Sequence, residues 1–138
     1  MNIYVSGALT GTLNIEDLKK FYEDIGMLCV ELGHEPYIPH LHSDPIKHNH
    51  LTPKQVYILD YGQVKSSDLV IAYIGMPSLG VGQEIEIANY EGVPIIVIYE
   101  DNKRVSRMAK GNPAILEELV FDNFDDALVK LRTLLLSL

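Results

Sequence analysis

Glu84 stands at a position where a carboxylate could do chemistry. It follows Gly80 and Gly82 in the stretch PSLGVGQEIEIA, where an apolar segment gives way to a helical pattern. Two interpretations compete: the glycines only form a tight turn before a solvated helix start, or the backbone bends there to hold a carboxylate against a ligand. The helix dipole favours a charged acid in a first helical turn, so we expect Glu84 to be ionised at neutral pH. Glu86 projects elsewhere, and we expect it to be solvated.

Asp60 is the second candidate, because it interrupts an apolar stripe. Val56, Asp60 and Val64 lie at successive i+4 positions of a predicted helix, which places a carboxylate among apolar side chains. Burying a charge without partners is costly, so this side chain must cap, pair, lie at a crevice edge or be partly protonated. The last two arrangements suit a general acid.

The histidine-containing segment PHLHSDPIKHNH is a possible metal site, but its pattern does not favour one. Its histidine spacing is not the HxxxH of a helical zinc site, and no cysteine joins it, so we expect no metal. His40, just past the second predicted strand, is close enough to reach a crevice at that edge of the sheet.

A basic stripe is predicted near the end of the chain. Lys103, Arg107 and Lys110 have the spacing of one face of a short helix. This face is either solvated or a contact with a phosphate or another subunit.

Composition restricts the partners. The 138 residues with 47% hydrophobic content predict one domain over residues 1–138, and the net charge of −8 disfavours a nucleic-acid polymer. The single cysteine, Cys29, is expected to be a core thiol in a reducing compartment. With no apolar run of about 20 residues and no signal-peptide pattern, we expect a cytoplasmic protein without a membrane partner.

The elements that position these residues alternate between apolar runs and helical patterns. Strands are predicted over residues 2–7, 35–39, 68–74, 94–99 and 119–122, and helix starts at Asn14, at the capping box Thr52–Gln55, near Glu84, and at Asn123 or Asp125. The near-continuous apolar runs suit parallel strands covered on both faces. The pattern predicts a doubly wound, flavodoxin-like α/β fold: five parallel strands in the order 2-1-3-4-5 with helices on both faces.

In such a sheet, ligands bind beyond the carboxyl ends of the strands, where the strand order reverses. Here that point lies between the first and third strands. The loop SGALTG follows the first strand, and GMPSLGVGQE follows the third. We expect the two loops to converge on one crevice.

Two other ligand-binding classes share this architecture. A dinucleotide site needs a third glycine after GVG, and a phosphate loop needs a lysine there, but the chain has neither. A phosphoacceptor receiver domain needs acidic residues near the end of the first strand, where Ser6, Gly7 and Ala8 stand. We therefore expect no cofactor.

Four stretches together resemble the nucleoside 2-deoxyribosyltransferase superfamily, which includes the 2'-deoxynucleoside 5'-monophosphate N-glycosidases. They are IYVSGALTG, the segment from Asp60 through SDLVIAYI, PSLGVGQEIEIA and RVSRMAKGN, and they span the chain to about Asn112. The pairing of Asp60 and Glu84 across the third strand is the most specific part. The resemblance implies that Glu84 is the nucleophile that forms a covalent glycosyl ester at C1'. It also implies that Asp60 helps protonate the departing base and that Tyr4 orients the nucleophile.

The resemblance also implies residues that bind substrate. Ser78 matches a serine of the monophosphate hydrolases, at a position where free-nucleoside transferases usually carry aspartate. Ser106, after a one-residue gap, and Asn112 resemble residues lent by a neighbouring subunit, which implies a homo-oligomer with shared active sites. Thr10 stands where the hydrolases have a phosphate-holding arginine, and Ala8 replaces a nearby serine, so the need for a phosphate stays open.

The sequence therefore predicts an enzyme that cleaves the N-glycosidic bond of a 2'-deoxynucleoside or its 5'-monophosphate and passes the sugar to an acceptor base or to water. One carboxylate stabilises an oxocarbenium-like state while the second acid assists the leaving group, and retaining glycosidases place two such groups roughly 5 to 6 Å apart. The expected substrate-binding residues are Ser6, Gly7, Thr10, His40, Ser78, Gly80, Gly82, Ser106 and Asn112. The alternative is a non-catalytic nucleotide-binding or regulatory module on the same fold.

Overall fold

The computed structural model describes residues 1–11 and 14–138, and its centre is a single parallel sheet. The strands are β1 (Asn2–Ser6), β2 (Glu35–Tyr37), β3 (Leu69–Tyr73), β4 (Ile95–Glu100) and β5 (Ile115–Phe121). Their order is β2-β1-β3-β4-β5. The predicted fold class and strand order are therefore confirmed.

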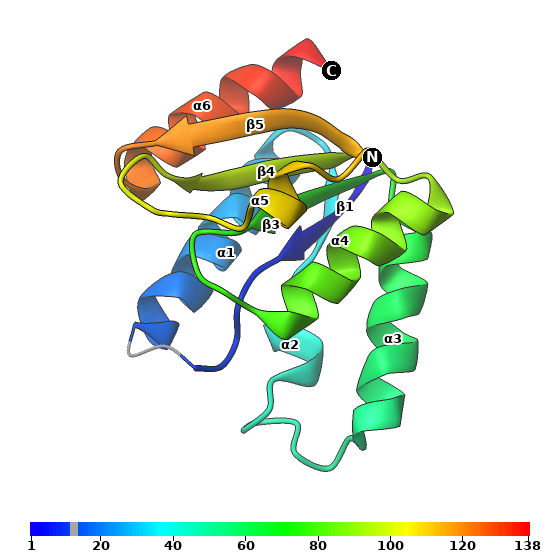
Figure 1. The fold of residues 1–138 in the computed structure, drawn as a ribbon. Coiled ribbons are helices and arrows are strands. Elements are labelled where there is room, and N and C mark those ends of the chain that lie inside the picture. Colours follow the sequence, from blue (N-terminus) through cyan, green and yellow to red (C-terminus); the bar gives the residue numbers. More distant parts are fainter. Residues whose placement is uncertain (12–13) are drawn as a thin grey trace.

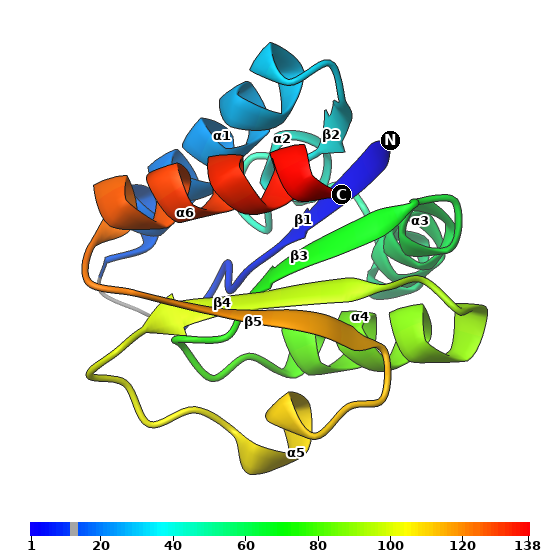
Figure 2. The ribbon, with the colours of Figure 1, turned by 90° about the horizontal axis from the view of Figure 1, so that it is seen from above.

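Helices cover both faces of the sheet. Helices α1 (Ile15–Glu31) and α6 (Phe124–Ser137) lie on one face, and α3 (Pro53–Lys65) and α4 (Leu79–Glu91) lie on the other (Figures 1 and 2). The short helices α2 (His40–Ser43) and α5 (Arg107–Lys110) follow β2 and β4. Within the described part of the chain, no helix has the length and apolar character needed to cross a membrane.

Local sequence explains where the helices begin. At α3, Thr52 Oγ1 accepts a hydrogen bond from the Gln55 amide at 3.2 Å, and Gln55 Oε1 accepts one from the Thr52 amide at 2.8 Å. This is the predicted capping box, and it satisfies two amides that a helix start leaves free. Asn123, rather than Asp125, caps α6 by accepting from the Asp126 amide at 2.9 Å.

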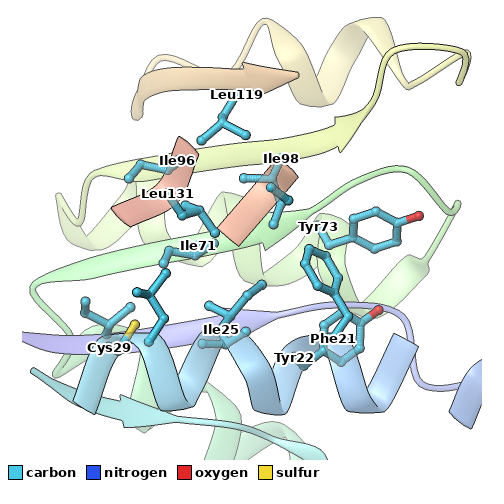
Figure 3. Close-up of a cluster of buried hydrophobic side chains, with 14 of the residues drawn as sticks. Phe21, Tyr22, Ile25, Cys29, Ile71, Tyr73, Ile96, Ile98, Leu119 and Leu131 are labelled. Carbon is cyan, nitrogen blue, oxygen red and sulfur yellow. The ribbon is translucent and has the colours of Figure 1, made fainter. Parts of the chain in front are cut away.

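Two hydrophobic layers fill the space between the sheet and the helices. The layer under α1 and α6 includes the labelled side chains of Figure 3, among them Phe21, Ile71 and Leu131. Cys29 is buried in this layer, as predicted, and burial raises the pKa of its thiol to about 11. Because side chains alternate along a strand, Ile3 and Val5 face this layer. Tyr4 packs in the opposite layer, under α3 and α4.

The structure corrects two details near the carboxyl end of the chain. Strand β5 begins at Ile115, earlier than predicted. It is an edge strand whose first residues, such as Leu116 and Glu117, are exposed, so they lack the continuous apolar pattern of a buried strand. The predicted basic stripe is wrong, because α5 begins only at Arg107 and so excludes Lys103. Lys110 of that stripe pairs with Glu118 at 3.0 Å.

Candidate active site

Asp60 and Glu84 line one cavity, of about 430 Å³, between α3, α4 and the chain that joins α2 to α3. Helix α3 precedes β3 and helix α4 follows it, so the two acids come from the elements on either side of one central strand. Gly80 and Gln83 of α4 and His48 of the connecting chain line the same cavity. The structure therefore brings together the two carboxyl groups that the sequence singled out.

Asp60 lies where its stripe on α3 meets the cavity. Val64 is fully buried beneath α3, whereas Val56 and Asp60 are half-buried and line the cavity. Burial raises the pKa of Asp60 to about 6. Of the arrangements that the sequence allowed for this carboxyl group, the crevice edge and partial protonation are the ones the structure supports.

The environment of Glu84 differs from the expected one. Ser78 is the N-cap of α4, so the helix begins before the glycines and Glu84 lies in the second turn, beyond the strongest effect of the dipole. The pKa of Glu84 is raised to about 8, mainly by burial and also by the nearby Asp60, whereas the hydroxyl groups of Tyr4 and Ser6 lower it. The expectation that the helix start keeps Glu84 ionised at neutral pH in the free protein is therefore wrong.

Tyr4 and Ser6 project from the same face of β1, because they are two residues apart on a strand. Both are fully buried, and both act on Glu84 closely enough to lower its pKa. In the described part of the chain, however, Tyr4 Oη, Ser6 Oγ and Glu84 Oε2 are buried atoms without a hydrogen bond of standard geometry. The cluster thus keeps two hydroxyl donors beside the carboxyl group of Glu84, which itself lines the cavity.

The two glycines before Glu84 belong to α4 rather than to a turn, and neither has a positive φ. A Cβ atom on Gly80 would lie 3.9 Å from Glu84 Oε1 and 3.9 Å from Ser78 Oγ. A Cβ atom on Gly82 would meet nothing within 4 Å. Only Gly80 therefore keeps a space open beside the carboxyl group.

Gly7, the other predicted glycine, lies where packing against Tyr22 leaves no room for a larger residue. A Cβ atom there would lie 2.2 Å from the ring of Tyr22, whose hydroxyl donates to the Ala8 carbonyl at 3.1 Å. Tyr22 thereby fixes the chain just after β1. Thr10, further along this chain, is exposed.

Three of the predicted residues lie at a second cavity, of about 390 Å³, on the other side of the α4 N-terminus. Ser78, Gly82 and Ser106 line it, together with Arg104. Ser78 Oγ accepts from the Val81 amide at 3.3 Å, and Ser106 Oγ accepts from the Ala109 amide at 3.2 Å, so each serine also caps a helix.

His40 and Asn112 lie away from both cavities. His40 is buried, and its Nε2 is 2.8 Å from Glu23 Oε1 of α1. Asn112 donates to Glu86 Oε2 at 3.1 Å and accepts from the Ala114 amide at 2.9 Å. Within one chain, the structure does not bring these two residues to Glu84.

Sequence reasoning missed three residues outside the motifs that lie near the two acids or line their cavity. Tyr37, at the end of β2, pairs in register with Tyr4, and Asp60 and Glu84 reinforce the effect of burial in raising the pKa of Tyr37 to about 12. His48 and Tyr57 line the cavity. Of these three, only Tyr37 had a usable signal, because the strand order already placed β2 beside β1.

No protein-family model matches the chain. A protein of Methanococcoides burtonii named "Putative 2'-deoxynucleoside 5'-phosphate N-hydrolase 1" is 30% identical over 114 residues, which cover 81% of this chain and 91% of the relative. A protein of the same name in Thermofilum pendens is 27% identical over 140 residues, which cover 98% of this chain and 95% of the relative.

Solved structures share the fold. The structure of a Clostridium botulinum CMP N-glycosidase has a TM-score of 0.76 and 23% identity over 97% of this chain and 99% of that one. A 2-deoxyribosyltransferase of Bacillus psychrosaccharolyticus has a TM-score of 0.67 and 17% identity over 92% of this chain and 90% of that one. With the sequence identity to the archaeal relative over most of both chains, the comparisons show that the chain belongs to the nucleoside 2-deoxyribosyltransferase superfamily of enzymes.

Proposed function

We propose that this enzyme cleaves the N-glycosidic bond of 2'-deoxynucleosides or their 5'-monophosphates through a covalent deoxyribosyl ester on Glu84. The observation that carries the proposal is the pair of carboxyl groups, Asp60 and Glu84, in one cavity with raised pKa values. Relatives and structural neighbours named for N-hydrolase, N-glycosidase and deoxyribosyltransferase activities support the reaction class.

The two steps balance with these groups alone. In the first, a Glu84 carboxylate oxygen bonds to C1', the bond from C1' to the base nitrogen breaks, and the proton of Asp60 goes to the base. In the second, water or an acceptor base attacks C1', its proton goes to Asp60, and Glu84 is released as a carboxylate. Each step passes through an oxocarbenium-like state of the sugar, which the carboxylate of Glu84 stabilises.

The protonation of the pair fits this chemistry. Because the two carboxyl groups interact, their protons leave the pair one after the other, near the pKa values of about 6 and about 8. At neutral pH the pair therefore holds one proton, mostly on Glu84, and the reaction uses the minor form with the proton on Asp60 and the charge on Glu84. The nearby hydroxyl groups of Tyr4 and Ser6, which lower the pKa of Glu84, increase the share of that form.

We propose that a 5'-phosphate lies on the Ser78 side of Gly80. The open space beside Gly80 borders both Glu84 Oε1 and Ser78 Oγ, so a sugar at Glu84 directs its 5' substituent towards the N-terminus of α4. Thr10 supplies no charge-assisted contact of the kind that an arginine makes with phosphate. We therefore expect both deoxynucleosides and their monophosphates to be cleaved.

Ser78→Asp tests this placement better than alanine does, because aspartate preserves the N-cap of α4. The added negative charge should lower kcat/KM for monophosphates and leave deoxynucleosides within about twofold. Equal loss for both substrates would place the phosphate elsewhere.

The resemblance to enzymes with shared sites leads us to propose a homo-oligomer in which Ser106 and Asn112 serve a neighbouring subunit. Mixing inactive Glu84→Ala chains with inactive Asn112→Ala chains should restore part of the activity. No recovery, after subunit exchange has been demonstrated, would count against shared sites.

The reaction itself is tested with a panel of deoxynucleosides and their 5'-monophosphates, each with and without an acceptor base, by chromatography of the released base. We expect base release with the wild-type protein and none with Glu84→Ala. A non-catalytic binding module would bind members of the panel and release no base from any of them.

A further inference from the structure

A buried ion pair ties the outer wall of the active-site cavity to α1. Lys19 of α1 and Asp44 form this pair, and their side chains are only 10% and 1% exposed. Lys19 lies in the second turn of α1, where the helix dipole gives a cation no advantage. An apolar pair of similar size would cost less to bury, so the pair needs an explanation other than packing.

Asp44 organises the chain between α2 and α3, which Figure 1 shows looping from α2 into the N-terminal end of α3. Its Oδ1 accepts hydrogen bonds from the amides of Ile46 at 2.8 Å and Lys47 at 3.0 Å. Its carbonyl accepts from the His48 amide at 2.8 Å. The contact with Lys19 lowers the pKa of Asp44, so the carboxylate that holds this turn stays charged.

The turn held by Asp44 forms the cavity wall opposite the catalytic candidates. His48, Asn49 and Leu51 line the cavity together with Asp60 and Glu84. Lys19 itself does not line it. Displacement of the turn would therefore change the shape of the cavity without moving α3 or α4, which carry the two acids.

We propose that Lys19 is a positioning residue for substrate binding, acting through Asp44 on the cavity wall formed by residues 44–51. This proposal rests on the proposed function, because it takes the cavity at Glu84 as the substrate site. The pair fixes where His48 and Asn49 stand relative to a bound substrate, and it takes no part in bond cleavage.

Lys19→Met is the test, and Lys20→Met is its matched control. Lys20 is the next residue of the same helix and pairs with Asp24 at 2.7 Å, but its side chain is 73% exposed. Assayed well below the melting temperature, Lys19→Met should raise KM by about tenfold or more and change kcat by less than about twofold. Lys19→Arg should restore KM, and Lys20→Met should behave as wild type.

Hydrogen exchange of the amides of residues 44–51 provides a readout that needs no turnover. We expect faster exchange there in Lys19→Met than in Lys20→Met. If Lys19→Met fails to fold, Asp44→Asn, which keeps an acceptor for the Ile46 and Lys47 amides, must show the rise in KM. A lower melting temperature with unchanged KM, or a loss confined to kcat, would overturn the proposal.

The two proposals fail separately. If the wild-type protein releases no base from any substrate, the proposed function fails, and exchange at residues 44–51 still decides whether Lys19 holds the wall. Unchanged exchange in Lys19→Met would then overturn the positioning proposal as well.

Discussion

The ring of Tyr4 stacks on the ring of Tyr37, with centroids 5.6 Å apart and planes inclined by 18°. The parallel register of β1 and β2 sets this contact, because it pairs the two residues directly. Both hydroxyl oxygens are buried, but only the Tyr4 hydroxyl contributes to the pKa of Glu84. The two tyrosines therefore differ in their effect on the pKa of Glu84, and Tyr37 can serve as a control for Tyr4.

Tyr4→Phe should shift the pH dependence of kcat/KM. In the proposed mechanism the pair of acids acts with one proton, so the wild-type profile should be bell-shaped, with limbs near pH 6 and pH 8. Removing the Tyr4 hydroxyl removes a group that lowers the pKa of Glu84, so that pKa rises and the alkaline limb moves up by roughly half to one pH unit. The maximum should fall, because the remaining proton then favours Glu84 over Asp60 even more strongly than in the wild-type protein.

Tyr37→Phe keeps the ring and should leave the alkaline limb where it is. If both variants moved the limb equally, the shift would come from general repacking of the stack. An unmoved limb in Tyr4→Phe would show that its hydroxyl does not act on Glu84.

Glu84→Gln should stabilise the fold in alkaline solution. Burial raises the pKa of Glu84 from 4.5 to about 8, so between these pH values the folded protein holds a proton that the unfolded chain has lost. Stability therefore decreases as pH rises through this window. A neutral glutamine avoids that cost, and we expect roughly 2–4 kcal/mol of added unfolding free energy at pH 9 and little change at pH 4.

Denaturant unfolding at the two pH values measures this difference, with Glu86→Gln as the control. Glu86 is exposed on the same helix, so its substitution should change stability little at either pH. A gain of the same size at pH 4 and pH 9 would mean that the ionisation of Glu84 is not its source.

Gly80→Ala and Gly82→Ala should separate stability from function. Both positions lie in α4, where alanine is favoured over glycine by about 0.5–1 kcal/mol, and neither added methyl group meets a close neighbour. Only the methyl group on Gly80 enters the space beside Glu84 Oε1. We therefore expect both variants to be folded and at least as stable as wild type, and Gly80→Ala alone to lose about tenfold or more in kcat/KM.

Thermal unfolding and steady-state kinetics on the same preparations check this pair. Equal activity of the two variants would show that the space beside Gly80 is not used by substrate.

The sequence was informative where local rules decide the structure. The alternation of apolar runs with helical patterns predicted the strand order, and the capping box at Thr52 predicted the start of α3. The stripe through Asp60 indicated a carboxyl group that must cap, pair, lie at a crevice edge or be partly protonated, and the structure places it at the edge of the cavity. These signals depend on periodicity and on side-chain hydrogen bonds within a few residues.

Other features depend on three-dimensional packing that no local pattern records. The state of Glu84 depends on burial against Tyr4 and Ser6, which follows from strand register, and not on its position along the helix. The glycines before it have the composition of a turn, but Ser78 caps the helix ahead of them, so they belong to α4. The burial of Lys19 against Asp44 joins two segments that are separated by β2, and neither segment carries a signal for it.

Asp60→Asn should slow the reaction in a way that depends on the leaving base. Asparagine keeps the shape of the side chain but cannot deliver the proton of a carboxylic acid, so the loss should be largest for bases that leave poorly without protonation. Relative kcat/KM values across a set of deoxynucleosides with different bases check this. A uniform loss for all bases would instead indicate that Asp60 only shapes the cavity.

In the proposed mechanism Glu84 forms a bond to C1' of the sugar, and the mass of a trapped reaction intermediate reveals that bond. The enzyme is quenched with acid during turnover of a deoxynucleoside, digested, and analysed by mass spectrometry, with Glu84→Gln treated in parallel. We predict one added deoxyribosyl group on the peptide that contains Glu84 and none in the variant. Full base release by Glu84→Gln, or a deoxyribosyl group found on a different residue, would contradict the account.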